Sequence, residues 1–340
     1  AHLSKNPEQP VANILVYLEN EKADFVYNKG FGQRSVSDTT SVQKDSPFKT
    51  ASITKMLTST LILQLVEEGK FKLSDPVITL IGDIDFVGFE KLMTINDKNY
   101  GSEITVGQLL NHTSGLADIF TDTQEEFMGL FFENPQKRWT HQDLFELYYR
   151  FNLNHRAHFK PGKGFYYSDT NYFLLGLVIE KYRALTLAEA YRTYILEPAM
   201  MKNTYFEYHE NSTNELSFPC SYMGNIEINK DINTSFDWAG GGLVSTTYDL
   251  SLFMKALFSK TLIKTDSLLK EMITDSKDKY GYGMFLYNFD GTRFYGHSGF
   301  WGSDVFYNPE EGITMVISVN QTHLPYSHKE FVRAIYDLIK

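Results

Sequence analysis

The 340-residue sequence contains a single cysteine, Cys220. One thiol cannot form an internal disulfide, and no second thiol is present to help bind a metal. The favoured role of Cys220 is therefore that of a small buried apolar side chain. A chain of this length, with 42% apolar and 15% aromatic residues, can bury a large hydrophobic core.

Long apolar runs are also absent. The longest candidates, residues 61–66 and 172–179, have the length of buried segments in a soluble protein and are too short to span a bilayer. Residues 1–10 are polar and lack the apolar centre of an export signal, so we expect any such signal to have been removed or never to have been present.

Basic residues are outnumbered by acidic ones. The chain has 32 Lys and Arg against 42 Asp and Glu, which gives a formal net charge of -10 at pH 7. The basic residues are also dispersed along the sequence. Because binding to a phosphate backbone requires clustered Lys and Arg, we expect no nucleic-acid partner.

The sequence contains no internal repeat, low-complexity tract or flexible linker, so we expect its parts to pack as one unit. Near the start, residues 13–17 and 23–27 have the pattern of two strands joined by a polar turn at 19–22. In the C-terminal third, apolar and β-rich or amphipathic patterns predict further elements: strands at 283–287, 304–307 and 314–319, and helices at 247–258 and 327–339.

Residues 74–233 have a mostly helical pattern, with helix starts indicated at Thr105, Thr140, Ser168 and Thr186. Sheet at both ends of the chain with helices between them predicts an α/β fold. We expect an antiparallel sheet flanked by helices, built from residues 1–73 and 234–340. A mainly helical domain over residues 74–233 is inserted between them, and the active site is expected in the cleft between the two parts.

A helix predicted over residues 51–68 carries apolar residues on nearly every face and ends at Gly69, so we expect it at the centre of the fold. Ser52 and Lys55 lie three residues apart at its start, which places both side chains on one face. A serine hydroxyl is a weak nucleophile that needs a neighbouring base. We expect burial to lower the pKa of Lys55 towards that of a usable base, and the helix start to offer N–H groups to an oxyanion.

The same Ser and Lys spacing occurs four more times in the sequence, so the apolar helix is what distinguishes Ser52. Two other segments carry suitable polar residues. Residues 165–172, FYYSDTNY, lie where a loop runs into an apolar helix, and their alternative interpretation is a polar turn capped by Ser168 or Asp169. Residues 296–299, GHSG, lie on a predicted strand whose glycines permit a ligand to approach the backbone.

Taken together and in this order, the three segments resemble the serine β-lactamase and penicillin-binding-protein superfamily. The resemblance is to its class C-like branch of esterases, D-amino-acid peptidases and carboxypeptidases. It covers nearly the whole chain, because further matching segments lie at residues 48–51, 65–76, 109–116, 197–204, 240–246 and 308–312.

The resemblance implies a role for each matching residue. Ser52 is the nucleophile, Lys55 its base or proton relay, and Tyr167 the phenol that shuttles the proton. His297 takes the place of the Lys that many β-lactamases have there, and is counted with the catalytic residues. The implied oxyanion hole is the backbone N–H groups of Ser52 and Phe300, and the implied substrate-binding residues are Asp169, Ser298, Gly299 and Phe300.

The resemblance also bears on partners and location. It implies a small-molecule or peptide acyl substrate and no metal or organic cofactor. It implies an exported protein, periplasmic or extracellular, with the cytoplasm as the alternative.

Two residues depart from the β-lactamase pattern. Asp169 stands where β-lactamases usually have Asn; an ionised carboxylate cannot donate to a substrate carbonyl, and it favours the charged form of Lys55. A neutral His297 would hold a β-lactam carboxylate less firmly than an ammonium group. Both departures favour an esterase or peptidase over an efficient β-lactamase.

Two other classes of protein compete with this interpretation. A non-catalytic binding or scaffold protein could keep the fold, but the presence of Ser52, Lys55 and Tyr167 together argues against it. A metal site is suggested by the spacing of His155 and His158, yet no cysteine or carboxylate cluster accompanies them, which favours exposed or packing roles. His112, in the segment NHTSG, is expected to anchor a loop.

Overall fold

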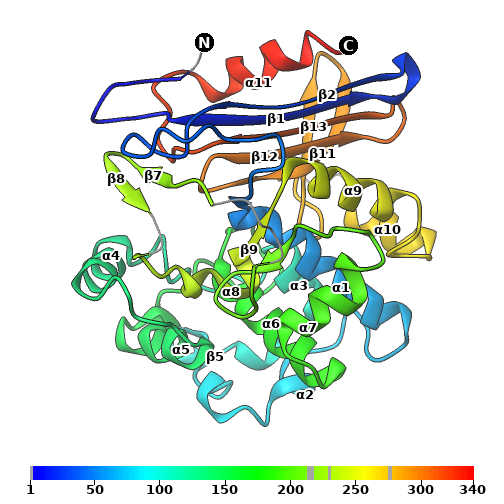
Figure 1. Cartoon of the computed structure of the whole chain (residues 1–340). Coiled ribbons are helices and arrows are strands. Elements are labelled where there is room, and N and C mark those ends of the chain that lie inside the picture. Colours follow the sequence, from blue (N-terminus) through cyan, green and yellow to red (C-terminus); the bar gives the residue numbers. More distant parts are fainter. Residues whose placement is uncertain (1–2, 213–217, 229–230, 275–277) are drawn as a thin grey trace.

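The computed structural model describes residues 3–340 except 213–217, 229–230 and 275–277 (Figure 1). Its largest sheet has six antiparallel strands in the order β10-β11-β12-β13-β1-β2. The strands are β1 (Asn13–Asn20), β2 (Phe25–Gly32), β10 (Phe285–Phe289), β11 (Thr292–Gly299), β12 (Ser303–Asn308) and β13 (Ile313–Val319). Because β1 pairs with both β2 and β13, the sheet is built from both ends of the chain, as predicted.

Both faces of this sheet are covered at the interior strand β1, and the alternation of its side chains shows how. Ile14, Val16 and Leu18 belong to an apolar cluster with α11 (His328–Tyr336), the helix that lies over the outer face in Figure 1. Leu15 and Tyr17 point the other way, into the large core shared with the helices. A strand whose two faces are both buried reads as continuously apolar, as this one does.

The predicted central helix is confirmed. A 3₁₀ turn (Ala51–Ile53) leads into α1 (Thr54–Glu67), in which every side chain from Thr54 to Leu65 is buried. Helices α6 (Asp169–Arg183) and α8 (Trp238–Gly241) pack against it. A helix that is apolar on all sides is stable only in such an enclosed position.

The predicted helix starts are confirmed as well. Helices α3 (Val106–Leu110), α5 (His141–Arg150), α6 and α7 (Leu187–Tyr191) follow directly after Thr105, Thr140, Ser168 and Thr186. The three threonines accept the backbone N–H of the third helical residue in complete capping boxes. The helix predicted over residues 247–258 is α9 (Thr247–Phe258).

The remaining elements are short or were not predicted. The helices are α2 (Ile78–Ile81), α4 (Gln124–Glu133) and α10 (Asp266–Met272). One small sheet joins β3 (Phe48–Lys49), β9 (Leu243–Ser245) and β6 (Tyr205–Phe206), and two hairpins join β4 (Thr94–Ile95) to β5 (Lys98–Asn99) and β7 (Ser221–Met223) to β8 (Ile226–Ile228).

The structure corrects two details. The first hairpin turns later than predicted, because Glu19 is a buried strand residue whose carboxylate accepts a hydrogen bond from Lys255 at 2.6 Å. Cys220 is half-buried, with its Sγ 3.4 Å from a Glu227 carboxylate oxygen, so it is not a purely apolar core residue. The division of the chain at residues 73 and 233 stays a prediction. No helix within the described ranges is long and apolar enough to cross a membrane.

Candidate active site

The backbone before Ser52 is strained. Ala51 has a φ of 45°, in the left-handed region that non-glycine residues rarely occupy. Strand β9 fixes the preceding residue, because the N–H and the hydroxyl of Thr50 both donate to the carbonyl oxygen of Leu243, at 3.0 and 2.7 Å. Backbone strain of this kind persists only where the surroundings determine it, and it is concentrated at functional sites.

Ser52 and Lys55 are in contact, as their spacing predicts. The fully buried Lys55 Nζ lies 3.1 Å from Ser52 Oγ, 2.5 Å from an Asp169 carboxylate oxygen and 2.9 Å from the Gly240 carbonyl oxygen. An ammonium group has three N–H donors, and here it has three acceptors. Gly240 must lack a side chain, since a Cβ there would lie 2.4 Å from the Asp169 carboxylate.

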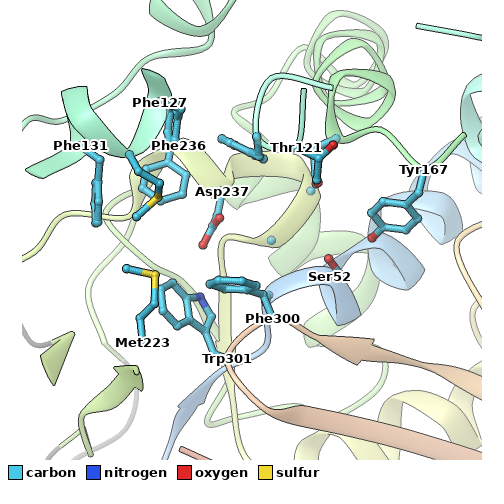
Figure 2. A pocket seen from close by; sticks show the side chains of 16 residues that line it. Ser52, Thr121, Phe127, Phe131, Tyr167, Met223, Phe236, Asp237, Phe300 and Trp301 are labelled. Carbon is cyan, nitrogen blue, oxygen red and sulfur yellow. The ribbon is translucent and has the colours of Figure 1, made fainter. Parts of the chain in front are cut away.

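Tyr167 approaches the same hydroxyl from the other side. Figure 2 shows its phenol directed at Ser52, and Lys55 Nζ lies 4.9 Å from the centre of its ring. Burial, and then the charge of Asp169, raise the pKa of Tyr167 well above its usual value, while the nearby Ser52 acts in the opposite direction. Within the described residues the phenol oxygen is buried and makes no hydrogen bond of normal geometry.

His112 anchors the loop that carries Tyr167, as expected. Its Nδ1 accepts hydrogen bonds from the Ser168 N–H at 3.1 Å and the Asn171 side chain at 3.0 Å. Its ring lies against that of Tyr167, with centres 4.2 Å apart. Burial, followed by the positive charge of Lys55, lowers the pKa of His112 well below its usual value, so the ring is neutral and can act as this acceptor.

His297 is buried beside the site and is also neutral. Its Nδ1–H donates to the Ser298 carbonyl oxygen at 2.7 Å, which leaves Nε2 to accept from the Tyr280 hydroxyl at 3.3 Å. Burial, and then the charge of Lys55, lower the pKa of His297 to about 3. The ring centre lies 6.1 Å from that of Tyr167, and His297 does not line the cavity at Ser52.

The three residues after His297, which are Ser298, Gly299 and Phe300, make different contacts. The Ser298 hydroxyl donates to Asp304 at 2.6 Å and does not line the cavity, so its side chain is not brought to the substrate position expected for it. Gly299 passes so close to the nucleophile segment that a Cβ would lie 2.3 Å from the Thr50 carbonyl oxygen. Phe300 lines the cavity together with Ser52, so the two residues implied for the oxyanion hole lie at the same cavity.

A cavity of about 240 Å³ lies next to Ser52 (Figure 2). Its walls are mainly apolar, and they come from α4, from the segment before α8, from β7 and from the turn after β11. The apolar lining residues are Phe120, Phe127, Met128, Phe131, Met223, Phe236, Phe300 and Trp301. Sequence reasoning missed most of this wall, because residues so far apart in the chain form no local pattern.

Two acidic residues at the site were also missed. Asp118 is buried, and its carboxylate accepts the Asp169 N–H at 2.5 Å, which positions the first turn of α6. Burial, and then the charge of Asp169, raise the pKa of Asp118 to about 6. The second is Asp237, which lines the cavity.

His155 and His158 are not arranged as metal ligands. His158 stacks on Tyr166 with ring centres 3.3 Å apart, and its Nε2 lies 3.0 Å from an Asp122 carboxylate oxygen. In the part of the chain that the structure describes, no group of three His, Cys, Asp or Glu side chains could hold a metal ion.

The sequence model of the family described as Beta-lactamase matches residues 15–336. The chain belongs to the Beta-lactamase family. Two curated relatives of this chain are Penicillin-binding protein 4* of Bacillus subtilis (strain 168) and Protein flp of Staphylococcus aureus (strain MRSA252). The first is 27% identical over 84% of this chain and 62% of that protein. The second is 27% identical over 93% of this chain and 61% of that protein. The chain thus spans about three fifths of the length of these relatives.

Several solved structures resemble this chain over almost its whole length. The D-stereospecific amidohydrolase from Streptomyces sp. has a TM-score of 0.79 and 25% identity, over 98% of this chain and 96% of that one. The octameric penicillin-binding protein homologue from Pyrococcus abyssi has a TM-score of 0.74 and 26% identity, over 96% and 73%.

A D-amino acid amidase from Ochrobactrum anthropi SV3 has a TM-score of 0.77 over 97% of this chain and 94% of that one, and at 21% identity it shows the Beta-lactamase fold alone. These likenesses confirm the superfamily and the fold predicted from the sequence.

Proposed function

We propose that this protein hydrolyses a small amide or ester through an acyl-enzyme at Ser52. The observation that carries the proposal is the position of the Ser52 hydroxyl, 3.1 Å from Lys55 Nζ and facing Tyr167, at the edge of a cavity. A nucleophile, proton carriers and a closed space for an acyl group are the parts that acyl transfer needs. A periplasmic or extracellular location is part of this proposal and rests on the family resemblance alone.

The proposed reaction has two halves. Lys55 first loses one proton to solvent. Ser52 Oγ then bonds to the acyl carbon, and the hydroxyl proton passes through Tyr167 to the neutral amine of Lys55. The same groups return the proton to the leaving nitrogen or oxygen as its bond to the acyl carbon breaks. Water then attacks the acyl carbon, a proton returns to Ser52 and the acid is released. The N–H groups of Ser52 and Phe300 stabilise the oxyanion in both halves.

The cavity favours some acyl groups over others. Its volume of about 240 Å³ is below the roughly 300 to 1,000 Å³ typical of sites for drug-sized ligands, so a compact acyl group is expected. None of the described residues that line it is Lys or Arg, and His297 is neutral, so a β-lactam carboxylate has no cationic partner there. An esterase or a peptidase is therefore proposed ahead of an efficient β-lactamase.

The names of two structural neighbours indicate a class of substrate. The Streptomyces protein is called a D-stereospecific amidohydrolase and the Ochrobactrum protein a D-amino acid amidase. Amides and esters of small D-amino acids are accordingly the first substrates to test.

The decisive experiment is labelling with a fluorescent fluorophosphonate, which modifies only an activated serine. We expect one label, located at Ser52 by mass spectrometry, and none in the Ser52→Ala variant. A label at Ser41, Ser168 or Ser298 with Ser52 unmodified would refute the assignment. A folded protein that takes up no label would instead support the alternative, a non-catalytic binding or scaffold protein.

A further inference from the structure

One acidic side chain, Asp237, extends into the otherwise aromatic part of the cavity. In Figure 2 its carboxylate lies in the space between Phe236, Trp301 and Phe300. The other acidic residue of the lining, Asp169, is paired with Lys55. Among the described residues, no Lys, Arg or His nitrogen lies within 4.0 Å of the Asp237 carboxylate, the limit for an ion pair. The charge of Lys49 favours the ionised form of Asp237, but Lys49 is itself paired with Glu207.

The backbone holds Asp237 in this position. Asp237 directly precedes α8, but its side chain does not cap that helix. The next residue, Trp238, has a φ of 29°, and its ring is tilted against that of His141 with ring centres 4.8 Å apart. A bulky residue in this strained conformation must be fixed by its packing. The backbone from which Asp237 projects is therefore held by the packing of Trp238.

Asp237 also lies close to the nucleophile. A Cβ added to Gly241 would be 3.3 Å from the Asp237 carboxyl carbon and 3.4 Å from the backbone carbon of Ala51. Without a side chain at Gly241, the carboxyl group can therefore lie beside the backbone that leads into Ser52. An acyl carbon bound to Ser52 would have its substituents within reach of this carboxylate.

Within the described ranges no cation forms an ion pair with Asp237, and Lys49 acts on it only from a distance. Burial, opposed by Lys49 and assisted by the charge of Asp169, raises the pKa of Asp237 to about 7. The indole N–H of Trp301 is the side-chain donor to it. A buried carboxylate with one neutral donor and no counter-ion is costly, and a ligand that brings a cation removes this cost.

We propose that Asp237 binds an ammonium group of the substrate, so that the cavity selects acyl groups that carry an amine next to an apolar or aromatic side chain. The inference rests on the proposed function, because it assigns part of the substrate of the same serine hydrolase. The N–H bonds of an ammonium can donate to the carboxylate oxygens of Asp237 beside the indole N–H of Trp301, and the faces of Phe236, Phe300 and Trp301 add cation–π attraction. Asp237 is thus a specificity-determining residue and takes no part in the proton transfers.

The test compares two esters of equal shape. Methyl phenylalaninate, as each enantiomer, carries the ammonium, and methyl 2-methyl-3-phenylpropanoate has a methyl group in its place. At pH 7, where a large share of this α-amino ester is still protonated, we expect the wild-type protein to favour one ammonium ester at least tenfold in kcat/KM. In Asp237→Asn that ratio should fall at least tenfold. Asp266→Asn is the matched control, because it removes the same charge from a side chain that is 77% exposed, and it should leave the ratio unchanged.

A second measurement needs only the wild-type protein, in case the Asn variant does not fold. Inhibition of neutral-ester hydrolysis by 2-phenylethylamine is compared with inhibition by 2-phenylethanol, and we expect the amine to bind at least tenfold more tightly.

Equal inhibition, an unchanged ratio in the variant, or labelling at Ser52 without hydrolysis of either phenylalanine ester would overturn the role of Asp237 and leave the serine hydrolase standing. Absence of both hydrolysis and labelling would overturn the two proposals together.

Discussion

Lys55 and Tyr167 reach the Ser52 hydroxyl in different ways. The ammonium of Lys55 is fixed by an Asp169 carboxylate and the Gly240 carbonyl as well as by Ser52, whereas the Tyr167 phenol is buried without a partner of normal geometry among the described residues. A buried hydroxyl left unpaired costs stability, which proteins accept mainly where the group has a chemical task.

The first prediction concerns these two residues. Lys55→Ala and Tyr167→Phe should each lower kcat for an ester substrate by roughly a hundredfold or more, the usual scale for general acid–base catalysis. The measurement is steady-state kinetics with a melting curve for each variant. If either variant keeps the wild-type kcat and a normal melting curve, the residue replaced in it takes no part in proton transfer.

The second prediction concerns Asp169. The carboxylate 2.5 Å from Lys55 Nζ stabilises the charged lysine and offers no donor to a substrate carbonyl. Asp169→Asn should therefore raise kcat/KM for a cephalosporin relative to a simple ester, and it should move the acidic limb of the pH–rate profile to lower pH. Both are measured from pH 5 to 9. If ratio and profile are unchanged, Asp169 acts only in the first turn of α6.

At the scale of elements, the end of β11 is held against the segment that leads into Ser52. The contact requires glycine, because a Cβ at position 299 would lie 2.3 Å from both the Thr50 carbonyl oxygen and the Ser303 hydroxyl. The strand and the nucleophile turn therefore cannot move independently. This contact holds the backbone next to Phe300 close to the backbone next to Ser52.

The third prediction uses two glycines. Gly299→Ala should lower kcat at least tenfold, since the added methyl group pushes β11 away from the nucleophile turn. Gly129→Ala in α4 is the control; nothing lies within 4 Å of its Cβ, and alanine in a helix interior is favoured over glycine by about 0.5 to 1 kcal/mol. Denaturant unfolding and ester hydrolysis are measured for both. If the two variants have equal kcat values and equal free energies of unfolding, the contact at Gly299 is not as tight as the distances indicate.

Some elements could be predicted from the sequence because their signals are local. Thr105, Thr140 and Thr186 mark helix starts through the capping boxes that they form. Helix α4 was not predicted, although Thr123 and Glu126 have the spacing of a capping box. In the structure Thr123 donates its hydroxyl to the Ile119 carbonyl and does not cap the helix. Strands of two or three residues, such as β6 and β9, are too short to show an alternating pattern.

The site divides in the same way. Ser52 and Lys55 are separated by one helical turn, so their meeting follows from the sequence. Asp237 is brought near Ser52 and Lys55 by the packing of α8 against α1 and by a strained backbone at Trp238. No local sequence pattern predicts either feature. The contact of the Ser298 hydroxyl with Asp304 could not be predicted, because it forms across the pair of strands β11 and β12.

For the molecule as a whole, buried titratable groups make stability depend on pH. The pKa of His297 is about 3 in the folded protein, against 6.5 as its ordinary value. Between these values the unfolded chain binds the extra proton, so this residue lowers the free energy of unfolding as the pH falls below about 6.5. Asp237, with its pKa raised to about 7, has the opposite effect, because there the folded protein binds the extra proton.

The fourth prediction follows from these signs. Relative to the wild type, His297→Gln should reduce the loss of unfolding free energy between pH 6 and 4.5 by about 1 kcal/mol per pH unit. Asp237→Asn should make that loss steeper. Urea unfolding at several pH values measures both slopes. If the two variants change the slope in the same direction, the assigned protonation states are wrong.

The pairing of β1 with β13 has a consequence for the synthesis of the protein on the ribosome. Ile14 is paired with Val319, about 300 residues later, so β1 must wait for β13 before this part of the sheet can form. Until then the apolar side chains of β1 lack the cover of α11, and pairing over so long a sequence separation is slow. Ser52 is translated well before the strand that ends beside it at Gly299. A ribosome that stops before β11 therefore releases a product that has its nucleophile and cannot hydrolyse anything with it.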